Sequence, residues 1–307
     1  MIASEARRAF EEALGDAVAF DVPMARHTSL RIGGPADVLA SPGSADEVAT
    51  VLRLCREHGL PHLAIGAGFN CLVSDEGIDG VVVKLNRMRA IEVGEGRIRA
   101  EAGVTHATLT KLCVDRGLSG LEFGAGIPGV VGGWIPMNAG IGSREMKDAV
   151  IAIEIVALDG SLQTTPSASL DFRYRHLANL EPGAVVVAAV FEVTPKTTEA
   201  VRAEVDRLLA KRAGTQPLNV PSCGSVFKNP EGDYAGRLIE AAGLKGRQVG
   251  GAQISPVHAN FIANTGGATA RDVRQLMEIA QEAVEKESGV RLEPEVRMLG
   301  RDAGGKA

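Results

Sequence analysis

Two glycine-rich segments are the first candidates for chemistry in this sequence. One is Ile65-Gly66-Ala67-Gly68-Phe69-Asn70, and the other runs from Gly124 to Gly133 and continues to Met137-Asn138-Ala139-Gly140. Glycines at this density let main-chain N–H groups converge on phosphate oxygens, because no Cβ atom stands in the way. An ordinary turn explains one such loop equally well, whereas two in one stretch favour a phosphate-binding function.

The second segment also contains a GxGxxG pattern between Gly124 and Gly129, with Asp148 about twenty residues further on. A dinucleotide-binding motif of the Rossmann type needs a buried strand before the pattern and a helix that opens at its third glycine. Residues 121–123 are too short for that strand, and the glycines and proline of residues 132–136 disfavour a stable helix. We therefore reject the Rossmann interpretation.

A candidate anion-binding cluster is Phe172-Arg173-Tyr174-Arg175. If this segment is extended, its two arginines share one face and its two rings share the other. The guanidinium group suits a carboxylate or a phosphate because its donors bind in pairs. Exposed arginines without a ligand remain the alternative.

Two later segments carry groups that could move a proton. Ser225 lies among small residues with Lys228 and Asn229 close by, which suits a hydroxyl donor or a structural turn, and no partner for a hydrolase triad accompanies it. In the expected strand at 290–299, alternation places Glu293, Glu295 and Arg297 on one face, either as an acid in a site or as a solvated ion pair.

Composition limits the function classes. The 307 residues correspond to about two domains, and 45% apolar with 23% charged residues is ordinary globular usage. The net charge of −5 gives no basic footprint for nucleic acid. No apolar run approaches the ~20 residues that span a bilayer, and the first residues lack the apolar core of a secretory signal. We expect a soluble, cytoplasmic monomer that binds neither nucleic acid nor membrane.

Cysteine and histidine spacing argues against a metal or a disulfide framework. The four cysteines, Cys55, Cys71, Cys113 and Cys223, form no CxxC pair. Only His58 and His62 have a ligand-like spacing, and the glycine and proline between them prevent one helix from presenting both. No metal site is expected.

The elements that must position these residues mix helices and strands without a regular βαβ order. This indicates α+β domains rather than one doubly wound sheet, with a boundary between Val193 and Gln216. The expected helices lie at 4–14 (with Ser4 as N-cap), 46–58, 105–116, 197–212, 234–242 and 269–289. The expected strands lie at 63–65, 80–85, 90–93, 97–102, 150–158, 184–193, 248–255, 261–264 and 290–299.

Taken in order, these segments resemble the UDP-N-acetylenolpyruvoylglucosamine reductase family, flavoenzymes of peptidoglycan precursor synthesis. The similarity covers roughly residues 25–300, and the ordered set is far more specific than any one motif. The matching segments are 27–36 (HTSLRIGGPA), 66–70, 126–129 with Gly132-Gly133, 137–140 (MNAG), Tyr174-Arg175, 222–230 (SCGSVFKNP) and 292–297 (LEPEVR).

The resemblance implies an FAD-binding domain of the vanillyl-alcohol-oxidase (PCMH) type at 29–196, after an N-terminal helix and lead-in at 1–28. A smaller α+β substrate-binding domain would occupy 197–307. FAD would bind non-covalently, and its contacts would include Gly66, Gly68, Asn70, Gly126, Pro128, Gly129, Gly132, Gly133, Asn138 and Gly140. NADPH would be the co-substrate, and the reaction would convert UDP-N-acetylglucosamine enolpyruvate to UDP-N-acetylmuramate.

The resemblance also implies roles for single residues. Arg175 would pair with the substrate carboxylate, Ser225 would donate the proton to C2, and Glu295 would support the enolic intermediate from the other side. Lys228 and Asn229 would contact the substrate.

The sequence departs from the family pattern in three places. Phe69 stands where serine is usual, Ile141-Gly142-Ser143 replaces a small residue, tyrosine and glycine, and Thr215 replaces a lysine. With Tyr174 and Tyr234 as its only tyrosines, the chain resembles the subgroup that lacks a tyrosine-bearing lid. The alternatives are another flavin-dependent oxidoreductase or oxidase of the same fold, or a non-catalytic nucleotide-binding module, which would not turn over NADPH.

Overall fold

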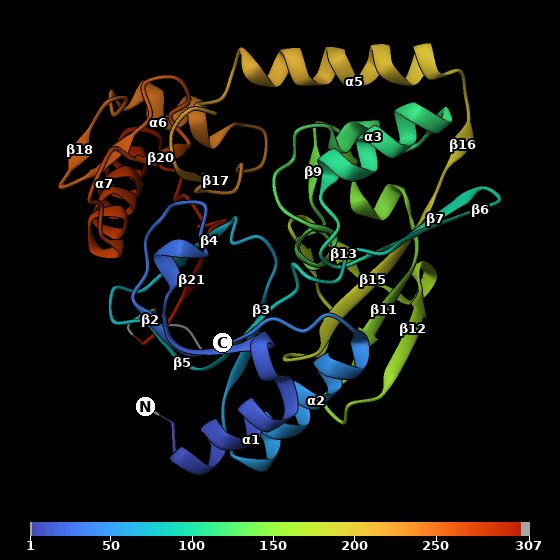
Figure 1. Cartoon of the computed structure of the whole chain (residues 1–307). Helices are drawn as coiled ribbons and strands as arrows, with labels where there is room; N and C mark the ends of the chain where they lie inside the picture. The colour runs from blue at the N-terminus through green and yellow to red at the C-terminus, as the bar shows by residue number, and fades with distance from the viewer. Residues whose placement is uncertain (1, 302–307) are drawn as a thin grey trace. The chain divides into compact units, whose positions relative to one another are not determined.

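The structure, a computed structural model, describes residues 2–301 and confirms the α+β class. The chain forms two compact units (Figure 1). The first unit contains the residues up to Phe20, Val38–Ala67 and Gly80–Arg212. The second unit contains Asp21–Asp37, Gly68–Asp79 and the described residues from Ala213 onward. Two early segments therefore belong with the C-terminal part of the chain.

Two helices and most of a four-stranded sheet form one part of the first unit, while residues 21–23, 35–37 and 78–79 of its strands fall in the second unit. Its strand order is β1-β2-β5-β3, with bounds β1 Val18–Pro23, β2 Pro35–Ala40, β5 Ile78–Lys84 and β3 His62–Ile65. The helices are α1 Ser4–Leu14 and α2 Ala45–Glu57. Phe10 of α1 and Val51 of α2 share one apolar core with Val83 of β5. Ser44 caps α2 by accepting the N–H of Glu47 at 3.2 Å. Ser4 is the first residue of α1 and not its N-cap, because the chain enters the helix at Ala3, which has no capping side chain.

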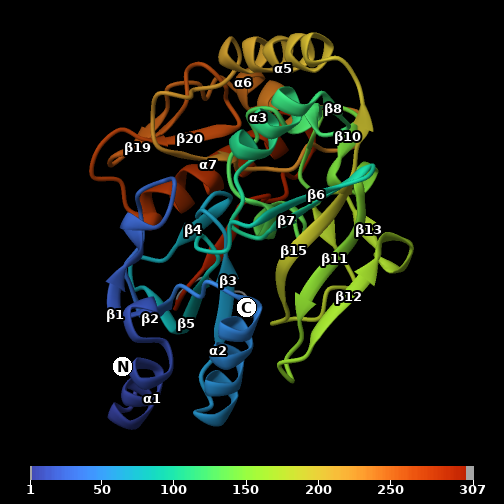
Figure 2. The ribbon, with the colours of Figure 1, turned by 45° about the vertical axis from the view of Figure 1, so that its right-hand side comes forward.

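The second part of the first unit is an antiparallel sheet of order β12-β11-β15-β7-β6, whose strands lie side by side in Figure 2. The bounds are β12 Leu162–Pro166, β11 Val150–Val156, β15 Val185–Glu192, β7 Arg97–Glu101 and β6 Ile91–Gly94. Helices α3 His106–Arg116, α4 Val131–Trp134 and α5 Thr198–Ala213 contribute to its core. Helix α4 is a single turn of four residues, so the segment at 132–136 forms no longer helix.

Short two-stranded pairs lie beside this sheet. They are β9 Gly140–Ile141 with β10 Arg144–Glu145, β13 Phe172–Arg173 with β14 His176–Leu177, and β8 Leu118–Ser119 with β16 Thr194–Pro195. The segment from Phe172 to Arg175 is therefore not one extended strand. Tyr174 and Arg175 form the turn of a hairpin, and Arg175 takes a left-handed φ of 57°.

The second unit is built on an antiparallel sheet of order β17-β20-β19-β18 covered by α6 and α7. The bounds are β17 Ser222–Ser225, β20 Phe261–Asn264, β19 Ala252–Ile254, β18 Gln248–Val249, α6 Ala235–Ala241 and α7 Ala270–Ser288. In α7 the predicted apolar stripe is buried, Thr269 and Asp272 form a capping box, and Gly289 ends the helix in a left-handed conformation.

Two strand predictions in the second unit were wrong in extent. The predicted strand at 248–255 is a hairpin, because Gly250 takes a positive φ of 50° and turns the chain between β18 and β19. The predicted strand at 290–299 is regular only as β21 Arg297–Leu299, which pairs in parallel with β4 Cys71–Val73. Pro294, which has no N–H to donate, makes only an isolated bridge with Phe227.

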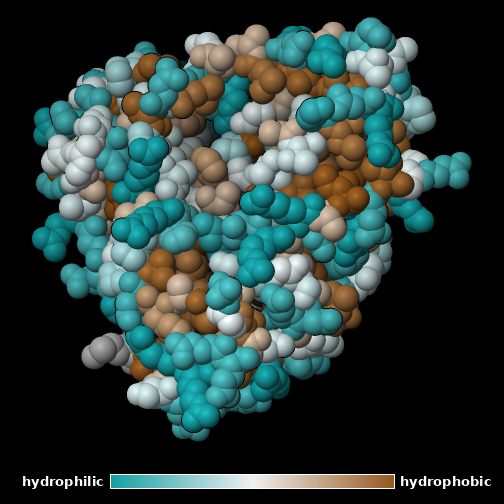
Figure 3. All heavy atoms as spheres, in the orientation of Figure 1, coloured by the Kyte–Doolittle hydropathy of each residue, from teal (hydrophilic) through white to brown (hydrophobic). Residues whose placement is uncertain are grey.

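The four cysteines are free thiols buried in the interior. Over residues 2–301, no helix combines the length and apolar character needed to cross a membrane, and no cluster of three or more His, Cys, Asp and Glu side chains is placed to hold a metal ion. On the face shown in Figure 3, the outer side of α1 is hydrophilic, as expected for a helix with one apolar face.

Candidate active site

Within the first unit, Gly66 of the first glycine-rich loop packs against the second loop. A Cβ atom on Gly66 would lie 2.6 Å from Cγ2 of Val130 and 3.6 Å from the amide nitrogen of Gly133. Gly132 is also required by close packing, since its Cβ would lie 2.8 Å from that of Ala102. A Cβ on Gly133, in contrast, would meet no atom within 4 Å. Close packing therefore explains why glycine is needed at positions 66 and 132, but it gives no reason for a glycine at position 133.

The remaining glycines of the second loop shape its backbone. Gly126 and Gly129 have φ angles of 80° and 103°, which side chains rarely allow. The carbonyl of Pro128 accepts the indole N–H of Trp134 at 3.0 Å, which ties the loop to the buried face of α4. The loop is thus held by the core beneath it.

The first loop offers main-chain donors. Within residues 2–301, the N–H groups of Gly66, Ala67, Gly68 and Phe69 make no hydrogen bond. Gly68 has a φ of 74°, and its Cβ would lie 2.0 Å from the carbonyl oxygen of His27, so this backbone path admits only glycine. A row of unpaired N–H groups in a glycine turn is a concave site for phosphate oxygens, and these residues fit the pyrophosphate of a dinucleotide cofactor.

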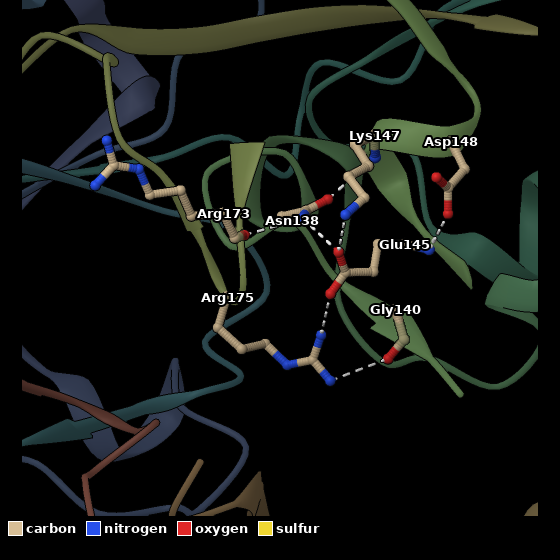
Figure 4. A network of polar contacts seen from close by, with 7 residues as sticks. All are labelled: Asn138, Gly140, Glu145, Lys147, Asp148, Arg173 and Arg175. Atoms are coloured by element: carbon tan, nitrogen blue, oxygen red, sulfur yellow. Dashed lines mark hydrogen bonds and ion pairs between the residues drawn. The ribbon is translucent and has the colours of Figure 1, made fainter. Parts of the chain in front are cut away.

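Arg175 lies at the turn of the β13–β14 hairpin, with only 18% of its side chain exposed (Figure 4). One terminal nitrogen lies 3.5 Å from a carboxylate oxygen of Glu145, and the other donates to the carbonyl of Gly140 at 3.3 Å. Gly140 and Glu145 are partners across the β9–β10 pair. The Arg173 guanidinium instead binds exposed Asp171. The hairpin thus separates the two arginines that the sequence analysis placed on one face.

Asn138 is fully buried beneath this hairpin and does not have the free side chain that a cofactor contact requires. Its amide nitrogen donates to Glu145 at 2.8 Å and to the carbonyl of Arg173 at 3.0 Å. Its amide oxygen accepts the N–H of Lys147. Since both donor hydrogens are used, the side chain of Asn138 positions Glu145 and the hairpin, and its main-chain N–H is committed to the carbonyl of Ile135 at 3.0 Å.

In the second unit, the segments that carry Ser225 and Glu295 are directly joined. The N–H groups of Glu295 and Val296 both donate to the carbonyl of Val226, at 2.8 and 3.2 Å. Ser225 and Glu295 are both partly buried. Two groups that can carry a proton thus lie on adjacent segments, partly shielded from water.

Lys228 and Asn229 follow on the same segment. The N–H of Lys228 donates to the carbonyl of Glu293, and its ammonium group lies 3.4 Å from the Glu293 carboxylate. The Asn229 side chain accepts the N–H of Ala235 at 3.1 Å, at the start of α6. The amide oxygen of Asn229 is thus committed to the helix, while Lys228 remains partly exposed.

Three residues outside the predicted set hold the site. Asn260 is buried and exchanges two hydrogen bonds with the main chain of Phe227, at 2.9 and 2.8 Å. Glu145 orients Arg175 as described above. His106 lies under the second loop, where burial lowers the pKa of its imidazole to about 4. Sequence spacing did not point to these residues, because their contacts with Phe227, Arg175 and Leu121 join segments that lie far apart along the chain.

Known proteins show clear similarity to this chain. Residues 216–299 match the family model of the UDP-N-acetylenolpyruvoylglucosamine reductase C-terminal domain, and residues 36–166 match that of an FAD binding domain. The reductase of that name from Geobacter metallireducens is 45% identical over 92% of this chain and 94% of its own length. The chain belongs to the UDP-N-acetylenolpyruvoylglucosamine reductase family. The relative from Latilactobacillus sakei is 43% identical over 91% of this chain and 92% of its own.

Solved structures give the same family and confirm the fold. The structure of the reductase from Thermus caldophilus has a TM-score of 0.79 and 35% identity, and the match covers 91% of this chain and 97% of that one. An alkyldihydroxyacetonephosphate synthase, at 18% identity and a TM-score of 0.51 over 64% of this chain and 44% of that one, shares the fold alone. The fold is thus the predicted α+β type with a vanillyl-alcohol-oxidase (PCMH) FAD-binding domain. Family membership and the FAD-binding domain make the chain an FAD-dependent oxidoreductase.

Proposed function

We propose that this protein reduces the enolpyruvyl double bond of UDP-N-acetylglucosamine enolpyruvate to form UDP-N-acetylmuramate, with NADPH as the source of hydride. Family membership supports the substrate class. Within the second unit, the supporting observation is the 2.8 Å hydrogen bond from the N–H of Glu295 to the carbonyl of Val226. This bond brings the two proposed proton-carrying residues to adjacent segments.

The first glycine loop supports a role in holding the cofactor. Bound FAD would supply the hydride chemistry, with NADPH as the hydride donor and C3 of the substrate as the acceptor. The N–H groups of Gly66 to Phe69 would donate to its pyrophosphate, and the bare surface at Gly133 would admit it without a clash. We assign FAD binding to residues 29–196 and substrate binding to 197–307. The segments 21–37 and 68–79 cluster with the latter.

The chain's own residues would handle charge and protons. Arg175 would bind the substrate carboxylate and stabilise the negative charge that spreads onto it as hydride reaches C3. Ser225 would then donate its hydroxyl proton to C2, with Glu295 supporting the enolic form from the opposite side. Lys228, whose ammonium group is only loosely paired, would bind an anionic part of the substrate.

We further propose that NADPH occupies the same site before the substrate and that the protein acts as a cytoplasmic monomer.

The function is tested by following the visible flavin absorbance without oxygen. Addition of NADPH should bleach the spectrum, and addition of UDP-N-acetylglucosamine enolpyruvate should restore it with formation of UDP-N-acetylmuramate. If the absorbance returns only when oxygen is admitted, the protein is an oxidase or uses a different acceptor. Failure to bind FAD after reconstitution would contradict the proposal at its first step.

A further inference from the structure

Glu145 contacts Arg175 through an ion pair that is long for its kind. The separation of 3.5 Å exceeds the roughly 2.7–2.9 Å of a charge-assisted N–H···O bond. The contact joins one terminal nitrogen of the guanidinium to one oxygen of the Glu145 carboxylate. The pair therefore gives Arg175 a direction and partly offsets its charge, at a separation longer than that of a tight ion pair.

The other oxygen of Glu145 is firmly held. It accepts from the buried amide of Asn138 at 2.8 Å and lies 3.0 Å from the ammonium group of Lys147. The main-chain N–H of Glu145 donates to Asp148 at 2.8 Å, as part of a capping box. With 14% of its side chain exposed, Glu145 has little freedom to follow Arg175 (Figure 4).

The backbone around Arg175 adds a second constraint. Its positive φ of 57° fixes the turn from which the side chain leaves the hairpin. Asn138 also binds the carbonyl of Arg173, so one buried amide links the hairpin to the carboxylate. A group that must meet a substrate carboxylate benefits from such support, since a displacement of about 1 Å costs on the order of 100-fold in rate.

We infer that Glu145 is a positioning residue for Arg175: it directs the guanidinium toward the substrate carboxylate and lowers the local positive charge, and Asn138 and Lys147 fix it in place. The inference rests on the proposed function of Arg175. Glu145 acts through Arg175 and does not touch the reacting atoms.

The inference predicts opposite effects on binding and on rate. Glu145→Gln keeps the size of the side chain and an oxygen for Asn138 but removes the negative charge. The anionic substrate should then bind about threefold more tightly to the oxidised holoenzyme, because the site is more positive. Reoxidation of the reduced flavin by the substrate should slow by about 10- to 100-fold, because Arg175 is less well oriented.

The holoenzymes of Glu145→Gln and Glu145→Asp should be compared with wild type and with Asp171→Asn. Substrate affinity is read from the flavin spectrum of the oxidised protein, and the rate from anaerobic stopped flow. Glu145→Asp restores the charge, so its affinity should return to the wild-type value and its rate should partly recover. Asp171→Asn removes the ion pair of Arg173 on the same hairpin, and both quantities should match wild type.

A wild-type rate in Glu145→Gln would overturn the inference. A parallel fall in substrate affinity, FAD content and melting temperature in both variants would also overturn it, since local unfolding would explain that result. A crystal structure of Glu145→Gln gives a readout independent of the reaction. The β9–β10 pair should stay in place while the guanidinium of Arg175 moves, and an unmoved guanidinium contradicts the inference. A wild-type protein that the substrate does not reoxidise would contradict the proposed function and leave this structural readout decisive for Glu145.

Discussion

The side-chain amide of Asn70 donates a 3.1 Å hydrogen bond to the main-chain carbonyl of Glu295, 225 positions further along the chain. The main chain of Asn70 extends the link: its carbonyl accepts the N–H of Arg297, and its N–H donates to the carbonyl of Cys223. The residue that ends the first glycine loop therefore also fastens the two segments that carry Ser225 and Glu295.

Asn70→Gly should remove the side-chain hydrogen bond to Glu295 while keeping the backbone conformation of this residue. Glycine accepts the φ of 52° at this position, so the substitution removes the side chain without adding strain. We expect the free energy of unfolding to fall by about 1 kcal/mol, the usual value of one hydrogen bond. Reoxidation of the flavin by the substrate should slow because the Glu295 segment is less well held. Urea denaturation and anaerobic stopped flow measure the two effects. Loss of FAD at unchanged stability would show that Asn70 acts chiefly on the cofactor.

Arg175→Lys should lower the turnover number strongly while FAD stays bound. Lysine keeps the positive charge but cannot offer paired, planar donors to a carboxylate. Loss of a group that stabilises developing charge costs about 10²- to 10³-fold in kcat. Steady-state kinetics of the holoenzyme provide the measurement. Arg173→Lys is the matched control, because the Arg173 side chain is exposed and binds Asp171. Equal losses in both variants would argue against a specific role for Arg175.

Glu295→Gln should reduce substrate turnover and spare flavin content. Removal of a positioned acid or base typically costs about 10²- to 10⁴-fold. The matched control is Glu293→Gln, which changes an exposed carboxylate two positions away. Because Glu293 contacts Lys228, this variant should act on the KM for the substrate and leave kcat unchanged. Full activity of Glu295→Gln in the steady-state assay would remove Glu295 from the mechanism.

Gly133→Ala should weaken FAD binding without lowering the stability of the fold. A Cβ at this position meets no protein atom within 4 Å, and the residue lies in α4, where alanine is favoured over glycine. The melting temperature of the apoprotein should therefore stay level or rise, while the Kd for FAD should rise at least about tenfold, because the methyl group occupies the surface proposed for the pyrophosphate. Gly43→Ala, whose Cβ has no neighbour nearer than 3.8 Å, is the control. Unchanged FAD affinity would place the cofactor elsewhere.

Stability should depend on pH through His106. Burial lowers its folded pKa to about 4 from an ordinary value of 6.5, and its ring nitrogens contact the carbonyl of Leu121 and the hydroxyl of Thr110. Between these two values the unfolded chain binds the proton and the folded protein does not, so stability falls as the pH falls. The expected loss is about 2 kcal/mol between pH 7 and pH 5. His106→Gln should remove most of this dependence in urea titrations at the two pH values. An equally steep dependence in the variant would assign it to other groups.

Local patterns were sufficient for much of the fold. The apolar stripe and caps of α7 follow from helical spacing between Thr269 and Gly289, and the glycine loops follow from residue type. The strand predictions that were wrong lie where a turn or a proline interrupts a pattern. Tyr174 and Arg175 form a hairpin turn. Pro294 makes only an isolated bridge, and the regular strand β21 begins after it, at Arg297. Alternation of side chains does not reveal such interruptions.

The sequence by itself determined the family, the cofactor class and the residue types that could carry charge and protons, because these depend on ordered motifs along the chain. Only the tertiary structure decided how those residues are supported. The buried Asn138 side chain donates to Glu145, and Glu145 forms an ion pair with Arg175, 30 positions further along the chain. Asn70 donates to the carbonyl of Glu295, which lies 225 positions away. The physical reason is that a buried polar group must find a partner, and the fold, rather than sequence spacing, determines which partner lies within hydrogen-bonding distance.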